Sequence, residues 1–223
     1  MKKVIYNFIL LILITFFSLT IILSTTGIKT KRFNNLIAKK INHLNNSINL
    51  KLTTIKFKLD LKELSLFLEA IDPKIYYQNS VIPAKNIKAY IDFISLVKSN
   101  PKLKKINLIL SQFDVEQLKK ISSNFKPSNF TSFINNRIKQ GKLNIELEVF
   151  LDDKNLFDNF IARGSVLNLE TEIKNNINLQ KTNFNFFADK NDILITNIVG
   201  ESGPIKIKDG DLKIKLNSEI SLQ

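Results

Sequence analysis

The residue types that ordinarily carry out chemistry are scarce in this chain and stand apart from one another. Its 223 residues include one histidine, His43, and no cysteine. A single imidazole without an acidic or thiol cluster beside it does not make a Ser-His-Asp triad or a zinc site, and a thiolate nucleophile is excluded. The glycine-rich loops that bind phosphates, of the GxGxxG and Walker kinds, are also missing. We therefore expect neither enzymatic activity nor a cofactor or metal.

Two acidic pairs suggest calcium at first sight, because carboxylates are the ligands that this ion prefers. They are Asp152-Asp153 and the Asp209-Gly210-Asp211 turn. Each lies among turn-forming residues, and neither has the additional oxygen ligands or the closing glutamate of an EF-hand loop. Turn geometry explains both pairs. Three glycines of the second half are likewise expected at bulges or turns: Gly164, Gly200 and Gly203.

The formal charge of +13 points to an acidic partner, either nucleic acid or anionic lipid. Arginine, which reads bases through bidentate hydrogen bonds, occurs only as Arg32, Arg137 and Arg163, so nucleic acid is not the expected partner. A solvated lysine-rich surface accounts for most of the charge, and attraction to anionic lipid headgroups is the second explanation.

The elements that would position any site begin with an apolar N-terminal segment. Residues 4–23 form one apolar run in which Asn7 is the only strong polar interruption. About 20 helical residues cross a hydrocarbon core of about 30 Å, whereas a cleavable signal peptide has a shorter apolar core and a small-residue exit that residues 24–27 do not provide. We predict a transmembrane anchor at residues 1–28 that is not cleaved. Lysines flank it on both sides, so the charges alone do not decide its orientation.

The apolar pattern after the anchor predicts one helix and then strands. Residues 31–48 carry apolar side chains at three- and four-residue steps, typical of an amphipathic helix that lies on the membrane or covers the end of a sheet. From Leu50 onward the period changes to two, which indicates strands. Asp72-Pro73 interrupts this pattern before a short strand at Ile75–Tyr77, and a short helix is expected at Ile94–Val97.

Two further helices are expected between about residues 114 and 140. Asp114 and Gln117 occupy the two positions of a capping box, and Pro127 separates the first helix from the second. Gly141 stands where a left-handed C-cap is expected. Each helix has an apolar stripe, formed by Val115, Leu118, Ile121 and Phe125 in the first and by Phe130, Phe133, Ile134 and Ile138 in the second.

From Lys142 onward the chain alternates as antiparallel strands. Further strands are predicted at 160–173, 176–187, 192–199, 204–208 and 212–222, with one apolar and one polar face. The fold class is α+β, mainly β: a transmembrane helix, an amphipathic helix and a long curved antiparallel meander with two short helices inserted. Residues 29–223 are expected to form one β-rich domain.

A sheet of this length cannot leave its apolar face uncovered, because soluble monomers rarely expose apolar patches beyond a few hundred Å². A closed sandwich or a lipid-filled groove are the two solutions. The last strands run almost to the terminus without a closing element. We therefore expect either that the sheet continues in a longer protein or that another subunit adds strands at this edge.

These features together resemble the N-terminal region of AsmA-like proteins, the group that includes TamB and YhdP. The resemblance is carried by IKFKLDLKELSLFLEAIDPKIYY (residues 55–77) and by IKAYIDFISLVKSNPKLKKINLIL (residues 87–110), in which Ile94–Val97 fills the position of a short helix between two strands. The stretches at 133–170 and 182–216 are similar to the way these proteins continue into repeated hairpins.

The resemblance implies a protein of the Gram-negative inner membrane whose bulk lies in the periplasm. It implies an apolar β-groove that holds the acyl chains of phospholipid on their way to the outer membrane, with membrane and phospholipid as partners. Family members are usually much longer, which favours an N-terminal portion or a short member. The candidate groove residues are the alternating apolar positions Leu143, Ile145, Leu147, Val149, Ile193, Ile195, Ile205 and Ile207.

Two alternatives remain open. One is a lipopolysaccharide carrier of the LptC-like kind, against which the helices expected at 31–48 and 114–139 count, since that fold is almost purely β. The other is an envelope assembly factor that binds a partner protein by strand addition at its C-terminal edge and carries no lipid.

Overall fold

The computed structural model describes residues 2–31, 34–35, 38–39, 47–63, 65–78, 80–92, 95, 102–152, 154, 156–174 and 177–216. Most of the amphipathic helix predicted at 31–48 lies outside the described residues. The same holds for the short helix predicted at 94–97, of which only Ser95 is described, in helical conformation.

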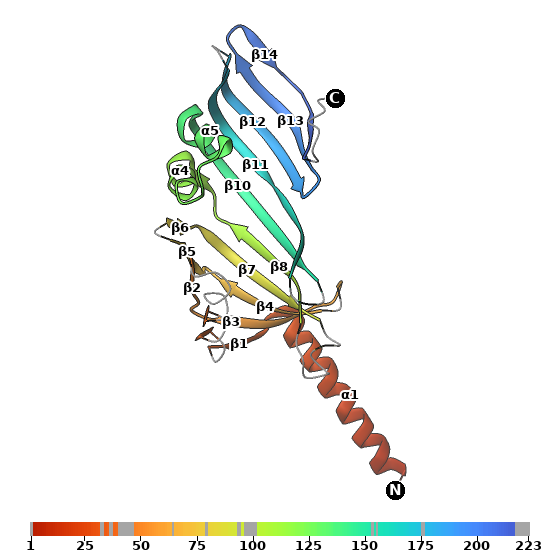
Figure 1. Cartoon of the computed structure of the whole chain (residues 1–223). Coiled ribbons are helices and arrows are strands. Elements are labelled where there is room, and N and C mark those ends of the chain that lie inside the picture. The colour runs from red at the N-terminus through yellow and green to blue at the C-terminus, as the bar shows by residue number, and fades with distance from the viewer. Residues whose placement is uncertain are drawn as a thin grey trace.

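Helix α1 (Lys2–Thr25) projects away from the rest of the molecule (Figure 1) and buries none of its residues. It is long and apolar enough to cross a membrane. The hydroxyls of Thr15, Thr20 and Thr25 donate to the carbonyl oxygens four residues earlier, at 2.8, 2.9 and 2.7 Å. These bonds satisfy polar groups that a hydrocarbon surrounding would leave without partners.

Gly27 makes the connection from α1 to the first strand. Its φ is +71°, and a Cβ at this position would lie 2.6 Å from both the carbonyl oxygen of Phe57 and Cγ of Lys58. Only glycine tolerates both the left-handed backbone and this close approach. The end of α1 is thereby held directly against the edge of the sheet.

The main sheet is antiparallel throughout, and its strand order follows the chain order (Figure 1). Beside this path, β9 (Phe113–Asp114) pairs with β10, and β15 (Leu212–Lys215) pairs with β13 on the edge that it shares with β14. The mainly β prediction of the α+β class is confirmed. The path runs through β1 (Ile28–Thr30), β3 (Ile55–Asp60), β4 (Ser65–Ile71), β7 (Ala84–Ile91), β8 (Leu103–Leu110), β10 (Ile138–Leu151), β11 (Phe157–Lys174), β12 (Ile177–Asp189), β13 (Asp192–Ser202) and β14 (Ile205–Ile207).

A separate small sheet is built from β2 (Ile48–Lys51), β5 (Lys74–Tyr77) and β6 (Ser80–Ile82). The break at Asp72-Pro73 turns the chain out of the main sheet, with Asp72 at a φ of 48°. The strands of the small sheet pack on one face of β7 and β8. The buried side chains of this core are Leu50, Ile75 and Ala84, and Ile48, Leu52, Ile82, Ile87, Leu108 and Leu110 pack around them.

Helices α4 (Val115–Ser122) and α5 (Asn129–Arg137) lie side by side at one margin of the sheet (Figure 1). The predicted capping box of α4 is confirmed: Asp114 Oδ1 accepts from the backbone N–H of Gln117 at 3.0 Å, and Gln117 Oε1 accepts from that of Asp114 at 3.2 Å. Ser128 caps α5 with Thr131 in the same way.

The predicted C-cap at Gly141 is wrong. Helix α5 ends at Arg137 with Ile138 as an extended C-cap, and the chain passes directly into β10. Gly141 lies within that strand at a φ of +153°, where a Cβ would contact Leu169 of β11 at 3.5 Å. The extended strand replaces the left-handed turn because Ile138 already pairs with Thr171.

Strands β11, β12 and β13 each contain one non-glycine residue with positive φ, namely Asn168 at 50°, Lys181 at 48° and Asn197 at 56°. The pairing register shifts beside all three, as β-bulges require. The predicted strand boundaries differ accordingly at the end of the chain. Strand β13 continues through Gly200 to Ser202, and the strand predicted at 212–222 ends at Lys215 within the described residues.

Candidate functional site

Directly paired residues of neighbouring strands point to the same side of a sheet, so the register assigns every side chain to a face. Phe57 of β3 begins one row of partners that crosses to β11, and Ile28 of β1 lies opposite Phe57. Leu108 of β8 begins a second row that crosses to β15. The rows are Phe57, Leu68, Ala89, Ile106, Val149 and Phe160, and Leu108, Leu147, Ala162, Ala188, Ile193 and Ile214.

Both rows lie on one side, because Val149 and Leu147 are two residues apart in β10. We call this side the apolar face. It extends without a break from β1, next to α1, to β15 at the opposite edge of the main sheet. The apolar positions of neighbouring strands therefore fall on the same face of the main sheet.

All eight candidate residues lie on the apolar face. Leu143, Ile145, Leu147 and Val149 share one side of β10, opposite Val166, Gly164, Ala162 and Phe160. Ile193 and Ile195 pair with Ala188 and Phe186. Ile207 pairs with Gly200 and Ile205 with Ser202. A Cβ on Gly200 would lie 2.4 Å from Oγ1 of Thr182, so Gly200 faces the same side as Thr182 and Phe184. Ile207 and Ile205 therefore lie on this side as well.

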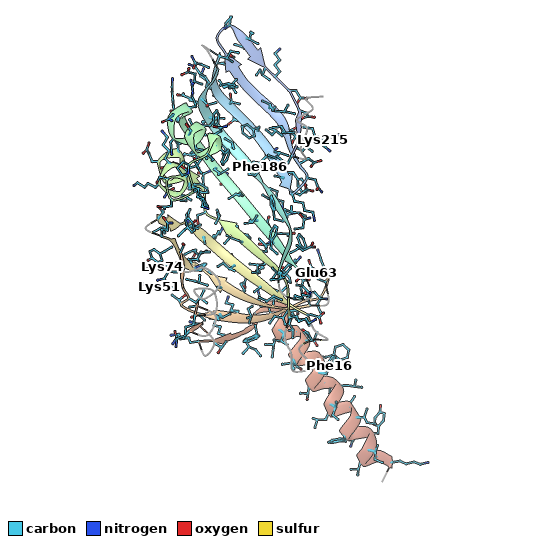
Figure 2. The ribbon with its side chains drawn as sticks, in the orientation of Figure 1. Phe16, Lys51, Glu63, Lys74, Phe186 and Lys215 are labelled. Carbon is cyan, nitrogen blue, oxygen red and sulfur yellow. The ribbon has the colours of Figure 1, made fainter. Side chains whose placement is uncertain are left out.

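Phe186 occupies the middle of this face in the C-terminal half of the sheet (Figure 2). Its partner across β11 is Gly164, and a Cβ there would lie 2.9 Å from Cζ of Phe186 and 2.0 Å from the carbonyl oxygen of Asn144. The expectation of a bulge or turn at Gly164 is therefore wrong. The residue lies in a regular part of the ladder, where the missing side chain makes room for the aromatic ring.

The opposite side, the polar face, carries a network of charged groups. Arg163 Nε donates to Glu146 at 3.0 Å, and Asn107 Nδ2 donates to Glu146 at 2.7 Å and to Glu148 at 3.2 Å. The hydrogen bond from Arg163 holds the pKa of Glu146 below its ordinary value and raises that of Arg163. The acids that alternate with the apolar residues of β10 thus have structural partners.

Two aromatic residues of the polar face, Phe67 in β4 and Tyr90 in β7, are buried. Phe67 stacks on Tyr90 with ring centroids 5.2 Å apart, and Lys105 Nζ lies 4.4 Å from the centroid of Tyr90. Burial, together with nearby carboxylates such as Glu63, raises the pKa of Tyr90 to about 12. Lysine stems and ammonium groups therefore shield this side.

The apolar face is covered only in part. The small sheet packs on β7 and β8, and α4 and α5 lie over one end of β10. Over the rest of β10 to β13, no further layer of the described chain packs on the apolar side. Side chains there, such as Leu147 and Ile193, are half-buried by their neighbours in the sheet and are open on the outside.

One acid of each acidic pair accepts hydrogen bonds from the backbone. Oδ1 of Asp152 accepts from the backbone N–H groups of Lys154 and Leu156, both at 2.8 Å. Oδ1 of Asp211 accepts from the backbone N–H of Asn197 at 3.1 Å, next to the bulge of β13. Within the described ranges, histidine and acidic side chains form no group of three that would hold a metal ion.

Comparison with protein-family models, curated proteins and solved structures found no significant match. The AsmA-like resemblance therefore stays a prediction from the residue pattern.

Proposed function

We propose that this protein is a membrane-anchored lipid-binding protein that holds the acyl chains of phospholipid on its apolar face. The observation that carries the proposal is the continuity of this face from the strand beside α1 to β15, with no covering layer over most of β10 to β13 in the described chain. Acyl chains are an occupant that needs apolar contact and no hydrogen bonds. Their burial contributes about 25 cal/mol per Å² removed from water.

The location of the anchor gives the proposed face a source of lipid. Gly27 holds the end of α1 against β3. If α1 spans the membrane as proposed, the first strands of the apolar face would begin at the membrane surface. We infer an inner-membrane protein of a Gram-negative envelope with its sheet in the periplasm, as the AsmA-like pattern implies. Lipid would enter beside the anchor and move across successive strands away from the membrane, with its headgroup in water at the open side.

Two pairs of substitutions in the same strands test the proposal. Phe186 and Ile195 are partners on the apolar face, and Phe187 and Leu194 are the adjacent partners on the polar face, with exposed fractions of 38% and 37% for the latter two. We expect Phe186→Asp with Ile195→Asp to abolish lipid retention, because two carboxylates on that face oppose an acyl chain. Phe187→Asp with Leu194→Asp should leave retention unchanged.

The measurement is mass spectrometry of lipid that co-purifies with the full chain, per mole of folded protein. Equal phospholipid content in both folded variants would contradict the assignment of the apolar face. Lipopolysaccharide in place of phospholipid would favour the carrier alternative, and a stable protein complex without lipid would favour the assembly factor.

A further inference from the structure

The helix pair encloses a pocket of about 460 Å³ against β10, which we call the helix-pair pocket. Both helices and the strand contribute to its wall, and the residues that matter here are Leu118, Ile121, Phe125, Phe133, Ile134 and Leu143. Polar side chains such as Lys126 and Ser128 come from the segment that joins the helices. The volume falls within the range of about 300–1,000 Å³ that small-molecule sites occupy.

This pocket adjoins the apolar face. A second cavity of about 160 Å³ lies under α4 and shares Leu118, Phe133 and Leu143 with the helix-pair pocket. Val166 and Phe184, which belong to the apolar face, line its other side. The helix-pair pocket therefore adjoins the smaller cavity, whose lining includes residues of the apolar face, and the two cavities share apolar walls.

Large apolar side chains at the margin of the helix pair stay exposed to solvent. Phe125 is 51% exposed and Phe130 is 71% exposed, both at the margin of the pocket, and in α5 the only buried residue is Ile134. Phe125 stacks on Tyr77 with ring centroids 5.0 Å apart, whereas Phe130 leaves apolar surface at the margin of the pocket that an apolar partner would cover.

We propose that the helix-pair pocket receives the terminal part of one acyl chain of a phospholipid that lies on the apolar face. The inference rests on the proposed function and adds a defined end site to it. Contact with the apolar face selects this occupant, since an acyl chain on the sheet lies beside an apolar pocket that shares Leu143 with that face. A peptide would bring backbone N–H and C=O groups into a wall that is almost entirely hydrocarbon, and these groups would lose their hydrogen bonds there.

Tryptophan reporters test the inference, because the chain contains no tryptophan. Three single variants of the full chain in detergent are compared: Phe133→Trp in the pocket, Phe186→Trp on the apolar face and Phe187→Trp on the polar face. The probe is phosphatidylglycerol with brominated acyl chains, since bromine quenches indole only at close contact. We expect loss of emission for the first two variants and no loss for the third, relative to the unbrominated lipid.

The outcomes separate the two proposals. Quenching at Phe186→Trp without quenching at Phe133→Trp overturns the end site and leaves the proposed function intact. Quenching at neither, or equally at Phe187→Trp, overturns the proposed function itself. The position of bromine gives a second measurement: emission from Phe133→Trp should fall more with bromine near the terminal methyl than near the ester, and the reverse order would also overturn the end site. Circular dichroism establishes that each variant is folded.

Discussion

Phe186 and Phe187 follow one another in β12 and meet opposite surroundings. Phe186 lies across Gly164 on the apolar face, whereas Phe187 pairs with Arg163 and Leu194 on the polar face. The two phenylalanines have different surroundings because successive residues of a strand point to opposite faces of the sheet. The molecule therefore offers paired tests at adjacent positions of one strand, in which the side chain is the same and the face differs.

Gly164 provides a prediction about packing. The methyl group of Gly164→Ala would approach the carbonyl oxygen of Asn144 and the ring of Phe186 too closely, so strands β10 and β11 must separate or the ring must move. We expect a loss of roughly 1–3 kcal/mol in the free energy of unfolding. Thermal unfolding followed by circular dichroism measures it. Gly210→Ala is the control, since its nearest contact would be an ordinary 3.6 Å; equal losses in both variants would contradict the steric argument.

Glu69 provides a prediction about pH. Burial opposes its ionisation, but hydrogen bonds from Asn86 at 2.9 Å and Lys58 at 3.2 Å outweigh burial and hold the pKa of Glu69 below its ordinary value of 4.5. At pH values above 4.5 the charged carboxylate of Glu69 therefore stabilises the fold. This stabilisation is lost as the pH falls through the lowered pKa. Unfolding of wild type and Glu69→Gln is compared between neutral and acidic pH. The wild type should lose more stability than the variant on acidification, and parallel curves would reject the argument.

Helix α4 shows how an element depends on a single cap. Asp114 and Gln117 satisfy one another's backbone N–H groups at its first turn. Because α4 forms one wall of the helix-pair pocket through Leu118 and Ile121, the cap also fixes the position of that wall.

Asp114→Ala should lower the free energy of unfolding by about 1 kcal/mol, the usual effect of removing an N-cap acceptor. Chemical denaturation measures the change, with Gln112→Ala as the control, because Gln112 is exposed and precedes the cap. A smaller loss in Asp114→Ala than in Gln112→Ala would show that the cap contributes nothing.

Local patterns predicted much of this structure. The period of two around Leu143–Val149 gave the strand and its common face, and the spacing of Asp114 and Gln117 gave the start of α4. The small sheet was not predicted, since Ile75 leaves the main sheet through contacts with Leu50 and Ala84 that are distant in sequence. Gly141 was misread because a glycine after a helix and a glycine within a strand look alike until the pairing partner, here Leu169, is known.

The residues of the candidate site were predicted, but their arrangement across the strands was not. Alternation placed Ile145 and Ile193 on faces of their own strands, but the register between strands decides that the two faces coincide. The bulges at Lys181 and Asn197 restore this coincidence further along β12 and β13, and no simple sequence period reports them. The helix-pair pocket was missed for a related reason, since it depends on how two helix stripes meet a third element.

At the scale of the whole molecule, the anchor and the sheet share one corner. Strand β1 begins directly after α1, and β3 runs antiparallel to it, so the end of β3 returns to the level of the anchor. Glu63 lies in the turn that follows β3. Leu61 of the same turn is 54% exposed. We expect this side chain to contact the membrane interface.

The prediction is tested with the full chain reconstituted in vesicles. Leu61→Trp should emit at shorter wavelength than Val81→Trp and be protected from aqueous iodide. Val81, which is 57% exposed in the small sheet away from α1, is the matched control. Equal iodide access in the two variants would show that the turn after β3 stands clear of the lipid.

The ordered succession of strands has a consequence for how the protein is made. A chain whose contacts are mostly between neighbouring segments needs little loop closure before each contact forms, and such chains fold quickly. From β3 onward, each strand of the main sheet is added beside those already made, on the side away from α1. Synthesis supplies about 5–20 residues per second, which is slow compared with hairpin formation. We therefore expect this sheet to grow during translation, one hairpin at a time, from the edge beside α1.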